Sequence, residues 1–417
     1  MERSNDLADQ SLFTSRVFWG LTCVAVVLVC SFSNPGFLDY PNHLARFYVM
    51  TRDFQSPFFQ SIYETNFRLL PNIGVDLLMF GFGRLIEPSI ALRLVLGTIV
   101  WLQCSGFYKL HLARNGRIIS PLVLLLPMTA VSYSFVLGFL NFSLAFGLLP
   151  WALVSVMRPR SRKWWLSLFG WSTALFFCHF FAWIIFAYLT LIWLFTQSSS
   201  KLRRSEIVTV FCLFFAFVAL YKLSPSSTEE SKIIWSSLSD KFKFVVATFV
   251  FGPFWKPATG LFFLLLSVLG LGRRFGISRD TKILLGATTA LFLVCPMGLS
   301  IGGNFDARIP AIFFSLLLSL STVKSSKFEQ RVVVGLGCMI TLIHLTACGI
   351  AMNRSNVEGA RARAVLTLLP ANSVVSVMSL NTGQSTHRDL WFPNYNMVQF
   401  VGVPEKPMHI QGLFSYP

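Results

Sequence analysis

Charged side chains are scarce in this chain of 417 residues, and acidic ones are the scarcest. Asp and Glu together number 18, Lys and Arg number 35, and charged residues make up only 13% of the sequence. We find no internal repeat, no glycine-rich nucleotide-binding loop after a predicted strand, and no catalytic serine motif. The eight cysteines all lie in apolar runs without metal-ligand spacing, so we interpret them as small buried hydrophobic residues. The usual sequence signals of nucleotide-binding enzymes, serine hydrolases and metal-stabilised domains are therefore missing.

Apolar and aromatic residues are abundant instead. Hydrophobic residues make up 54% of the chain, 43 residues are Phe, and the mean hydropathy is +0.62. This composition predicts an all-α polytopic membrane protein. The formal net charge of +17 comes from basic residues in short loops between apolar runs. Such a distribution is typical of membrane topology rather than of nucleic-acid binding.

The apolar runs predict about eleven transmembrane helices. The predicted spans cover residues 17–32, 89–110, 119–135, 138–157, 164–178, 180–195, 207–223, 259–271, 283–301, 310–323 and 332–352. With this number of spans the basic loops fall on the cytoplasmic side if the N-terminus is cytoplasmic and the C-terminus is extracytoplasmic. The first run lacks a convincing small-residue cleavage site, so we interpret it as a retained span rather than a signal peptide.

These spans divide the chain into three parts. Residues 1–16 form a cytoplasmic N-terminus, residues 17–352 form the membrane domain, and residues 353–417 form a small extracytoplasmic tail. The tail is too short to build a core of its own, so we expect it to pack over the outer face of the membrane domain as a lid.

The first outer loop, residues 33–87, is long and holds predicted surface helices. One of them is the apolar run Ile73–Ile86, which carries Asp76 and Arg84. Counting this run as a span would place every later basic loop outside, against the positive-inside rule. We therefore predict that it lies on the membrane surface.

The same loop contains the run Asp39-Tyr40-Pro41-Asn42-His43-Leu44-Ala45-Arg46. Pro41 suits the first turn of a helix, where a missing N–H costs nothing. The apolar residues that follow recur at helical spacing, and Asp39 and His43 fall one turn apart. We predict an amphipathic helix with an acid and an imidazole at its start, and we interpret it as the catalytic end of the protein.

Other predicted outer loops place further polar residues on the same side of the membrane. They are Asn141, His179, Asp306 and Arg308. Ionisable groups in so apolar a chain are costly unless they line a wet cavity. Their convergence on one face therefore predicts a functional site there.

Each of these residues also has a purely structural alternative. Asp39 alternatively caps the helix that follows it, or pairs with Arg46 across that helix. Asp306 and Arg308 alternatively form an exposed ion pair, worth only about 0–1 kcal/mol. Asn141, His43 and His179 alternatively make only local hydrogen bonds at the membrane interface.

The layout resembles the GT-C superfamily of membrane glycosyltransferases: one N-terminal span, a long outer loop with an acid at its start, then many spans. These enzymes, among them the protein mannosyltransferases and the aminoarabinose transferase of lipid A, take a sugar from a polyprenyl-phosphate carrier. The run from Asp39 to Arg46 also resembles a motif of bacterial multispan proteins grouped with that superfamily. Their Asp-x-Arg motif before a late span matches Asp306-Ala307-Arg308, and their Gly-rich C-terminal stretch matches Gln411-Gly412-Leu413-Phe414.

One departure from the superfamily concerns metal binding. Many of these enzymes carry paired acids in the first outer loop, whereas here Asp39 stands alone beside Tyr40. A lone carboxylate with one histidine is a thin site for Mg²⁺ or Mn²⁺. We therefore assign no metal ligand and no certain cofactor, and leave a divalent metal open.

The resemblance implies an integral membrane glycosyltransferase of a bacterial inner membrane. It would move a sugar from polyprenyl phosphate to an extracytoplasmic glycan, lipid or protein acceptor, with no nucleic-acid partner. Asp39 would be the general base, and His43 would orient the acceptor or help the phosphate leave. The other implied roles are donor-phosphate binding by Arg308, Arg46 and Asp306, and pocket walls formed by Asn141 and His179.

Three alternatives remain from the sequence. A flippase or transporter would move a lipid-linked sugar without breaking bonds, although such proteins tend to show inverted repeats and interrupted helices. A polysaccharide polymerase or ligase would use basic residues in a late outer loop, and the run Ser224–Lys256 contains several lysines. A structural membrane subunit is the third alternative.

Overall fold

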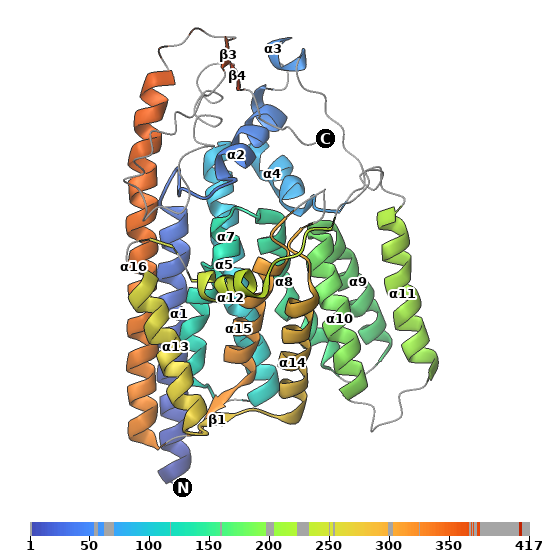
Figure 1. The fold of residues 1–417 in the computed structure, drawn as a ribbon, viewed down its shortest axis with the longest axis vertical. Coiled ribbons are helices and arrows are strands. Elements are labelled where there is room, and N and C mark those ends of the chain that lie inside the picture. Colours follow the sequence, from blue (N-terminus) through green and yellow to red (C-terminus); the bar gives the residue numbers. More distant parts are fainter. Residues whose placement is uncertain are drawn as a thin grey trace.

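The computed structural model describes residues 2–53, 57–61, 71–116, 118–158, 161–196, 204–222, 233–249, 251–252, 255–298, 303–324, 326–366, 368, 370, 373–375 and 408–410. Most of these residues are helical, and the helices run roughly parallel to one long axis (Figure 1). The N-terminus lies at one end of this bundle, and α2 (Tyr40–Tyr48) and α4 (Gly74–Leu85) lie at the other (Figure 1). We call that second end the α2 end.

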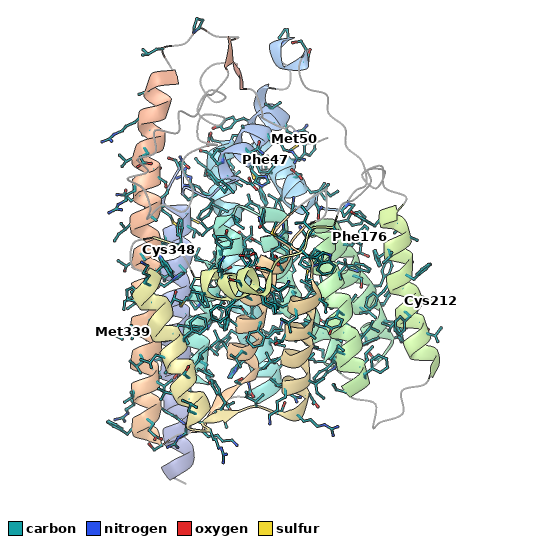
Figure 2. The ribbon with its side chains drawn as sticks, in the orientation of Figure 1. Phe47, Met50, Phe176, Cys212, Met339 and Cys348 are labelled. Atoms are coloured by element: carbon teal, nitrogen blue, oxygen red, sulfur yellow. The ribbon has the colours of Figure 1, made fainter. Side chains whose placement is uncertain are left out.

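The body of the bundle consists of long apolar helices. They are α1 (Glu2–Cys30), α5 (Pro88–Asn115), α8 (Leu140–Val156), α9 (Arg162–Cys178), α10 (Phe180–Thr196), α11 (Arg204–Lys222), α13 (Trp255–Leu271), α14 (Arg279–Val294), α15 (Ile309–Leu320) and α16 (Lys327–Leu366). Helix α5 contacts α1, α8 and α15, and therefore lies centrally. Apolar side chains fill the space between the helices (Figure 2).

Three helices among the described residues are long and apolar enough to cross a membrane: Ser11–Cys30, Pro88–Asn115 and Phe328–Arg361. Shorter apolar helical segments are Pro121–Val136, Leu140–Val156, Phe180–Thr196, Val208–Tyr221 and Trp255–Leu271. The all-α class is thereby confirmed, together with apolar helices suited to a membrane. The number of crossings stays a prediction.

Short helical pieces occur between the long helices of the bundle. The chain between α5 and α8 forms η2 (Pro121–Leu125), α6 (Leu126–Ala130) and α7 (Tyr133–Val136), and α12 (Leu238–Ala247) and η4 (Asp306–Arg308) lie beside α7 and each other. The remaining short pieces are η1 (Val49–Asp53) and α3 (Pro57–Gln60). Two pairs of short strands complete the fold: antiparallel β1 (Phe275–Gly276) with β2 (Thr322–Val323), and parallel β3 (Ser373–Val375) with β4 (Met408–Ile410).

The predicted helix after Asp39 is present as α2, with Pro41 in its first turn. Its apolar side buries Leu44, Phe47 and Tyr48, and Phe47 lies among the helices of the α2 end (Figure 2). The run Ile73–Ile86 corresponds to α4, which has 12 residues. At about 1.5 Å per residue it is about 18 Å long, too short to cross a hydrocarbon core of about 30 Å.

Two boundaries differ from the sequence prediction. Helix α1 already begins at Glu2, within the predicted cytoplasmic N-terminus, and α16 continues from the last predicted span to Leu366, within the predicted tail. Neither extension contains proline, so nothing in the local sequence ends the helix at the predicted boundary. Most of the remaining tail, including the Gln411–Phe414 match, lies outside the described residues.

Candidate functional site

Asp39 lies at the start of α2, where the chain contacts the turn between α7 and α8. Its backbone N–H donates to the carbonyl of Leu137 at 3.3 Å, and the N–H of Leu38 donates to the carbonyl of Val136 at 3.1 Å. The Asp39 side chain makes no capping hydrogen bond to α2. The structural alternative of a simple helix cap is therefore not observed. Among the described residues, no hydrogen bond or ion pair of its half-buried carboxylate is found.

The environment of Asp39 changes its acidity. Burial raises the pKa of its carboxyl from 3.8 to about 6, and the charge of Arg308 opposes this rise. A carboxylate with this pKa is mostly ionised at neutral pH, yet accepts a proton more readily than an ordinary aspartate. These are the properties of a general base.

His43 is held next to Asp39 by the turn that precedes α8. Its Nε2 donates to the carbonyl oxygen of Gly138 at 3.1 Å, so the proton of the neutral ring is on Nε2. Burial, reinforced by the nearby charge of Arg46, lowers the pKa of His43 to about 4. His43 is therefore neutral at physiological pH, and its geometry is that of a positioning residue.

Gly138 allows this close approach. Its φ of +80° lies in the left-handed region that favours glycine, and a Cβ built there would lie 2.8 Å from the backbone nitrogen of Asp39. The turn between α7 and α8 thus packs its backbone directly against the backbone of the candidate base.

Arg308 is the buried cation of the site, with only 5% of its surface exposed. Its Nη1 donates to Nε2 of His179 at 3.0 Å, and its Nη2 donates to the carbonyl of Gly303 at 3.1 Å. The guanidinium carbon lies 4.1 Å from the centre of the Phe139 ring, a cation–π distance. Burial lowers the pKa of Arg308 to about 10, so it remains charged at neutral pH. Its buried Nε has no hydrogen-bond partner in the described part of the chain.

Asp39 and Arg308 act on each other without forming an ion pair. Each charge stabilises the charged form of the other, yet the structure shows no contact between the two side chains at ion-pair distance. A carboxylate and a guanidinium thus lie near one another at the α2 end, and neither neutralises the other by direct contact. Sequence reasoning predicted both residues here, from segments far apart in the chain.

His179 lies at the tight junction between α9 and α10. It accepts the hydrogen bond from Arg308 described above, so its ring proton is on Nδ1, which is buried and has no described partner. Burial, and secondarily the charge of Arg308, lowers the pKa of His179 well below its ordinary value. His179 therefore positions the arginine, whereas the sequence suggested a wall of a sugar pocket.

Asp306 does not pair with Arg308, and its carboxylate is already bound by other side chains. It is completely buried, accepts a hydrogen bond from Ser236 at 2.5 Å, and forms an ion pair with Lys241 at 3.3 Å. Lys241 also donates to the carbonyls of Phe292 and Cys295, at 2.9 and 2.7 Å. This carboxylate joins the segment before α12 and Lys241 of α12 to η4, and so supports the segment that carries Arg308. The role of Asp306 in donor binding stays a prediction.

Asn141 has a structural role as well. Its side-chain oxygen accepts from the N–H of Val75 at 2.7 Å, and its nitrogen donates to the carbonyl of Asn72 at 2.6 Å. The side chain of Asn72 in turn accepts from the N–H of Phe180 at 3.2 Å. These bonds attach the start of α4 to α8 and to the junction of α9 and α10. Asn141 therefore holds α4 in place, and its role as a pocket wall stays a prediction.

Arg46 pairs with Asp76 of α4 and not with Asp39. The N–O distance is 3.2 Å, and 49% of the arginine side chain is exposed against 5% of the aspartate side chain. Burial raises the pKa of Asp76, and Arg46 opposes that rise. The charge of Arg46 is therefore already partly neutralised by a carboxylate.

The sequence assigned no role in this site to Lys241, Asn72 or Gly138. Lys241 falls in an amphipathic run with charged neighbours, and its spacing gives no sign of burial. Asn72 precedes Gly74 and adopts a positive φ of 71°, a conformation that asparagine tolerates better than most residues. Only an Asn–x–Gly turn pattern before the apolar run could have indicated it. No group of three or more His, Cys, Asp or Glu side chains suited to a metal ion occurs within the described residues.

Comparisons of this chain with protein-family models, with curated proteins and with solved structures give no match.

Proposed function

We propose that this protein is a membrane glycosyltransferase of the GT-C type, which transfers a sugar from a polyprenyl-phosphate carrier with Asp39 as general base. The observation that supports this proposal most is the arrangement of Asp39 and Arg308. A half-buried carboxylate without a described partner lies near a buried guanidinium, and the two do not neutralise each other in an ion pair. Such a pair provides a base and a phosphate ligand at one end of an apolar bundle.

The chemistry follows from these two groups. Asp39 takes the proton of an acceptor hydroxyl as its oxygen attacks the anomeric carbon. The bond from that carbon to the phosphate oxygen breaks, and the bonding electrons leave with polyprenyl phosphate. Arg308 stabilises the negative charge that develops on the phosphate, which suits a guanidinium with a free N–H. A single displacement of this kind inverts the anomeric configuration.

The same proposal includes the membrane arrangement. About eleven crossings, a cytoplasmic N-terminus and an outward-facing α2 end in a bacterial inner membrane would place the site at the outer surface. The alternation of the bundle helices and the short surface helix α4 are consistent with that layout. The lipid tail of the donor would then remain in the membrane while its phosphate reaches the site.

The polymerase or ligase alternative has less support than it had from the sequence. It depended on free lysines in the run Ser224–Lys256, of which Lys241 is buried in an ion pair with Asp306. Lys243 pairs with Asp240 on the surface of α12.

The test uses the full chain purified in detergent and a panel of polyprenyl-phosphate sugars, with a membrane extract as the source of acceptor. Release of polyprenyl phosphate is measured for the wild type and for Asp39→Asn. Loss of a general base is expected to reduce release by about 10²–10⁴-fold. The matched control is Asp240→Asn, which removes an exposed carboxylate of α12 outside the site.

The outcomes separate the hypotheses. Release by wild type and control, with loss in Asp39→Asn, supports the proposal and identifies the sugar. Equal release by all three proteins removes Asp39 from the mechanism. No release from any donor by a correctly folded wild type refutes the transferase and favours a transporter of lipid-linked sugars.

A further inference from the structure

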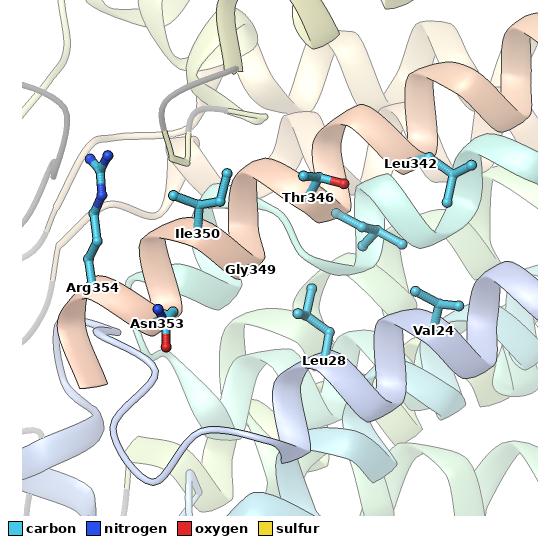
Figure 3. A pocket seen from close by; sticks show the side chains of 9 residues that line it. Val24, Leu28, Leu342, Thr346, Gly349, Ile350, Asn353 and Arg354 are labelled. Carbon is cyan, nitrogen blue, oxygen red and sulfur yellow. The ribbon is translucent and has the colours of Figure 1, made fainter. Parts of the chain in front are cut away.

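A groove runs along the outside of the bundle between α1 and α16, away from Asp39 and Arg308. Its volume is about 470 Å³. Figure 3 shows Val24 and Leu28 of α1 facing α16, with Leu342 near one end of the groove and Arg354 near the other. Its lining is mainly apolar and is completed by Leu345, Thr346, Gly349, Ile350 and Asn353.

The groove has the length of one membrane leaflet. From Leu342 to Arg354 the helix rises by about 18 Å, close to half of a hydrocarbon core of about 30 Å. The uncharged run of α16, Val332–Met352, covers about 21 residues, which corresponds to about 31 Å of helix. Arg354 therefore lies just beyond the apolar run, at the level of lipid headgroups.

The polar end of the groove carries the positive charge of Arg354. Arg354 is exposed, and within the described residues it makes no ion pair or hydrogen bond. Asn353 beside it is also exposed and offers an amide donor. Arginine at this level attracts anionic lipid headgroups, with an effect of about fivefold for each basic residue near the surface.

The same part of α16 holds the segment that leads to Asp39. Asn356 accepts hydrogen bonds from the side chain of Ser33 at 2.8 Å and from the backbone N–H of Asn34 at 3.1 Å. Gly36 has a φ of +72° and lies so close to Ser355 that no Cβ would fit. A ligand at Arg354 would therefore bind one or two residues along the helix from contacts that fix the segment before α2.

We infer that the groove between α1 and α16 binds one anionic glycerophospholipid from the leaflet at the α2 end, with an acyl chain along the apolar lining and the phosphate at Arg354. The apolar length selects a lipid chain, and the arginine selects a negative headgroup. This inference does not depend on the proposed glycosyltransferase activity.

The test is native mass spectrometry of the full chain in detergent, titrated with phosphatidylglycerol or with phosphatidylcholine of the same acyl chains. We expect the wild type to prefer phosphatidylglycerol about fivefold. Arg354→Gln should abolish the preference, and Arg354→Lys, which keeps the charge, should retain most of it. The matched control is Arg331→Gln, which removes an exposed charge from the opposite end of the same helix.

A second variant tests the apolar part. A Cβ at Gly349 would lie 3.1 Å from Leu28, so Gly349→Leu places a side chain in the groove. Weaker binding of both lipids by this variant, with unchanged thermal unfolding in lipid-free detergent, supports the inference.

Three results would overturn the inference. The first is equal binding of both lipids by the wild type. The second is an equal loss of preference in Arg331→Gln. The third is displacement of phosphatidylglycerol by polyprenyl phosphate in a manner that depends on Arg354, which would assign the groove to that lipid instead.

Discussion

Replacing Gly138 by alanine tests whether the α7–α8 turn positions the candidate base. The new Cβ would lie 2.8 Å from the backbone nitrogen of Asp39 and 3.0 Å from its Cβ. Contacts below about 3.4 Å are tighter than normal, so Asp39 or the turn must move by about half an ångström. The hydrogen bond from His43 to the Gly138 carbonyl would shift with it.

The expected cost has two parts. Alanine at a φ of +80° is strained by about 1–2 kcal/mol. Forcing a methyl group into a closely packed site adds about 1–3 kcal/mol. We therefore expect the variant to lose about 2–5 kcal/mol of unfolding free energy. Because a displacement of about 1 Å can reduce catalysis about a hundredfold, the folded variant should also lose activity about tenfold or more.

Unfolding in detergent is followed by intrinsic fluorescence, and activity by release of polyprenyl phosphate at a temperature where the variant is folded. The control is Gly81→Ala in α4, where a Cβ meets no atom within 4 Å. Alanine is the better helix former, so the control should be as stable as the wild type or up to about 1 kcal/mol more stable. A Gly138→Ala protein with wild-type stability would refute the packing argument. Reduced stability with unchanged activity of the folded protein would refute only the positioning of Asp39.

Two further predictions concern the raised pKa of Asp39 and the buried ion pair between Lys241 and Asp306. Because the pKa of Asp39 is raised to about 6, the rate of transfer should fall about tenfold between pH 7.5 and pH 5, as Asp39 takes up one proton. The measurement is the pH dependence of kcat/KM. The raised pKa also means that Asp39 contributes to stability at low pH, and that this contribution is lost as the pH rises from 3.8 through about 6. The stability of the wild type should therefore fall relative to that of Asp39→Asn within this interval and run parallel to it above and below. For the ion pair, Lys241→Met leaves the buried Asp306 without its cation, and the free energy of unfolding measured with denaturant should fall by about 3–5 kcal/mol. The double variant with Asp306→Asn should recover part of this loss, whereas additive losses would contradict a direct interaction.

Much of the fold follows from local sequence. The apolar runs predict helices because each run must satisfy its backbone hydrogen bonds internally when water is absent. Pro41 and the apolar spacing after it place α2 to within a residue of its observed start. The charges Asp76 and Arg84 predict that the run of α4 does not cross the membrane, and its 12 residues are too few for a crossing.

The candidate site was only partly predictable. Asp39, His43 and Arg308 were identified because ionisable residues are rare in this chain and costly within a membrane. The hydrogen-bond and ion-pair partners of these residues were not identified, because such contacts join positions far apart in sequence. Arg308 contacts a histidine 129 residues away, and no local pattern contains that information.

Composition and spacing by themselves determined that the chain is all-α, that it carries membrane-compatible helices, and that an acid and an imidazole lie at the start of the helix after the first apolar run. Those properties depend on each residue and its near neighbours along the chain. Only the tertiary structure decided which charged side chains form ion pairs. Arg46 pairs with Asp76 and Asp306 pairs with Lys241, whereas Asp39 and Arg308 influence each other's charge without an ion pair. The physical reason is that burial and pairing are set by which helices pack together, and packing is a property of the whole bundle.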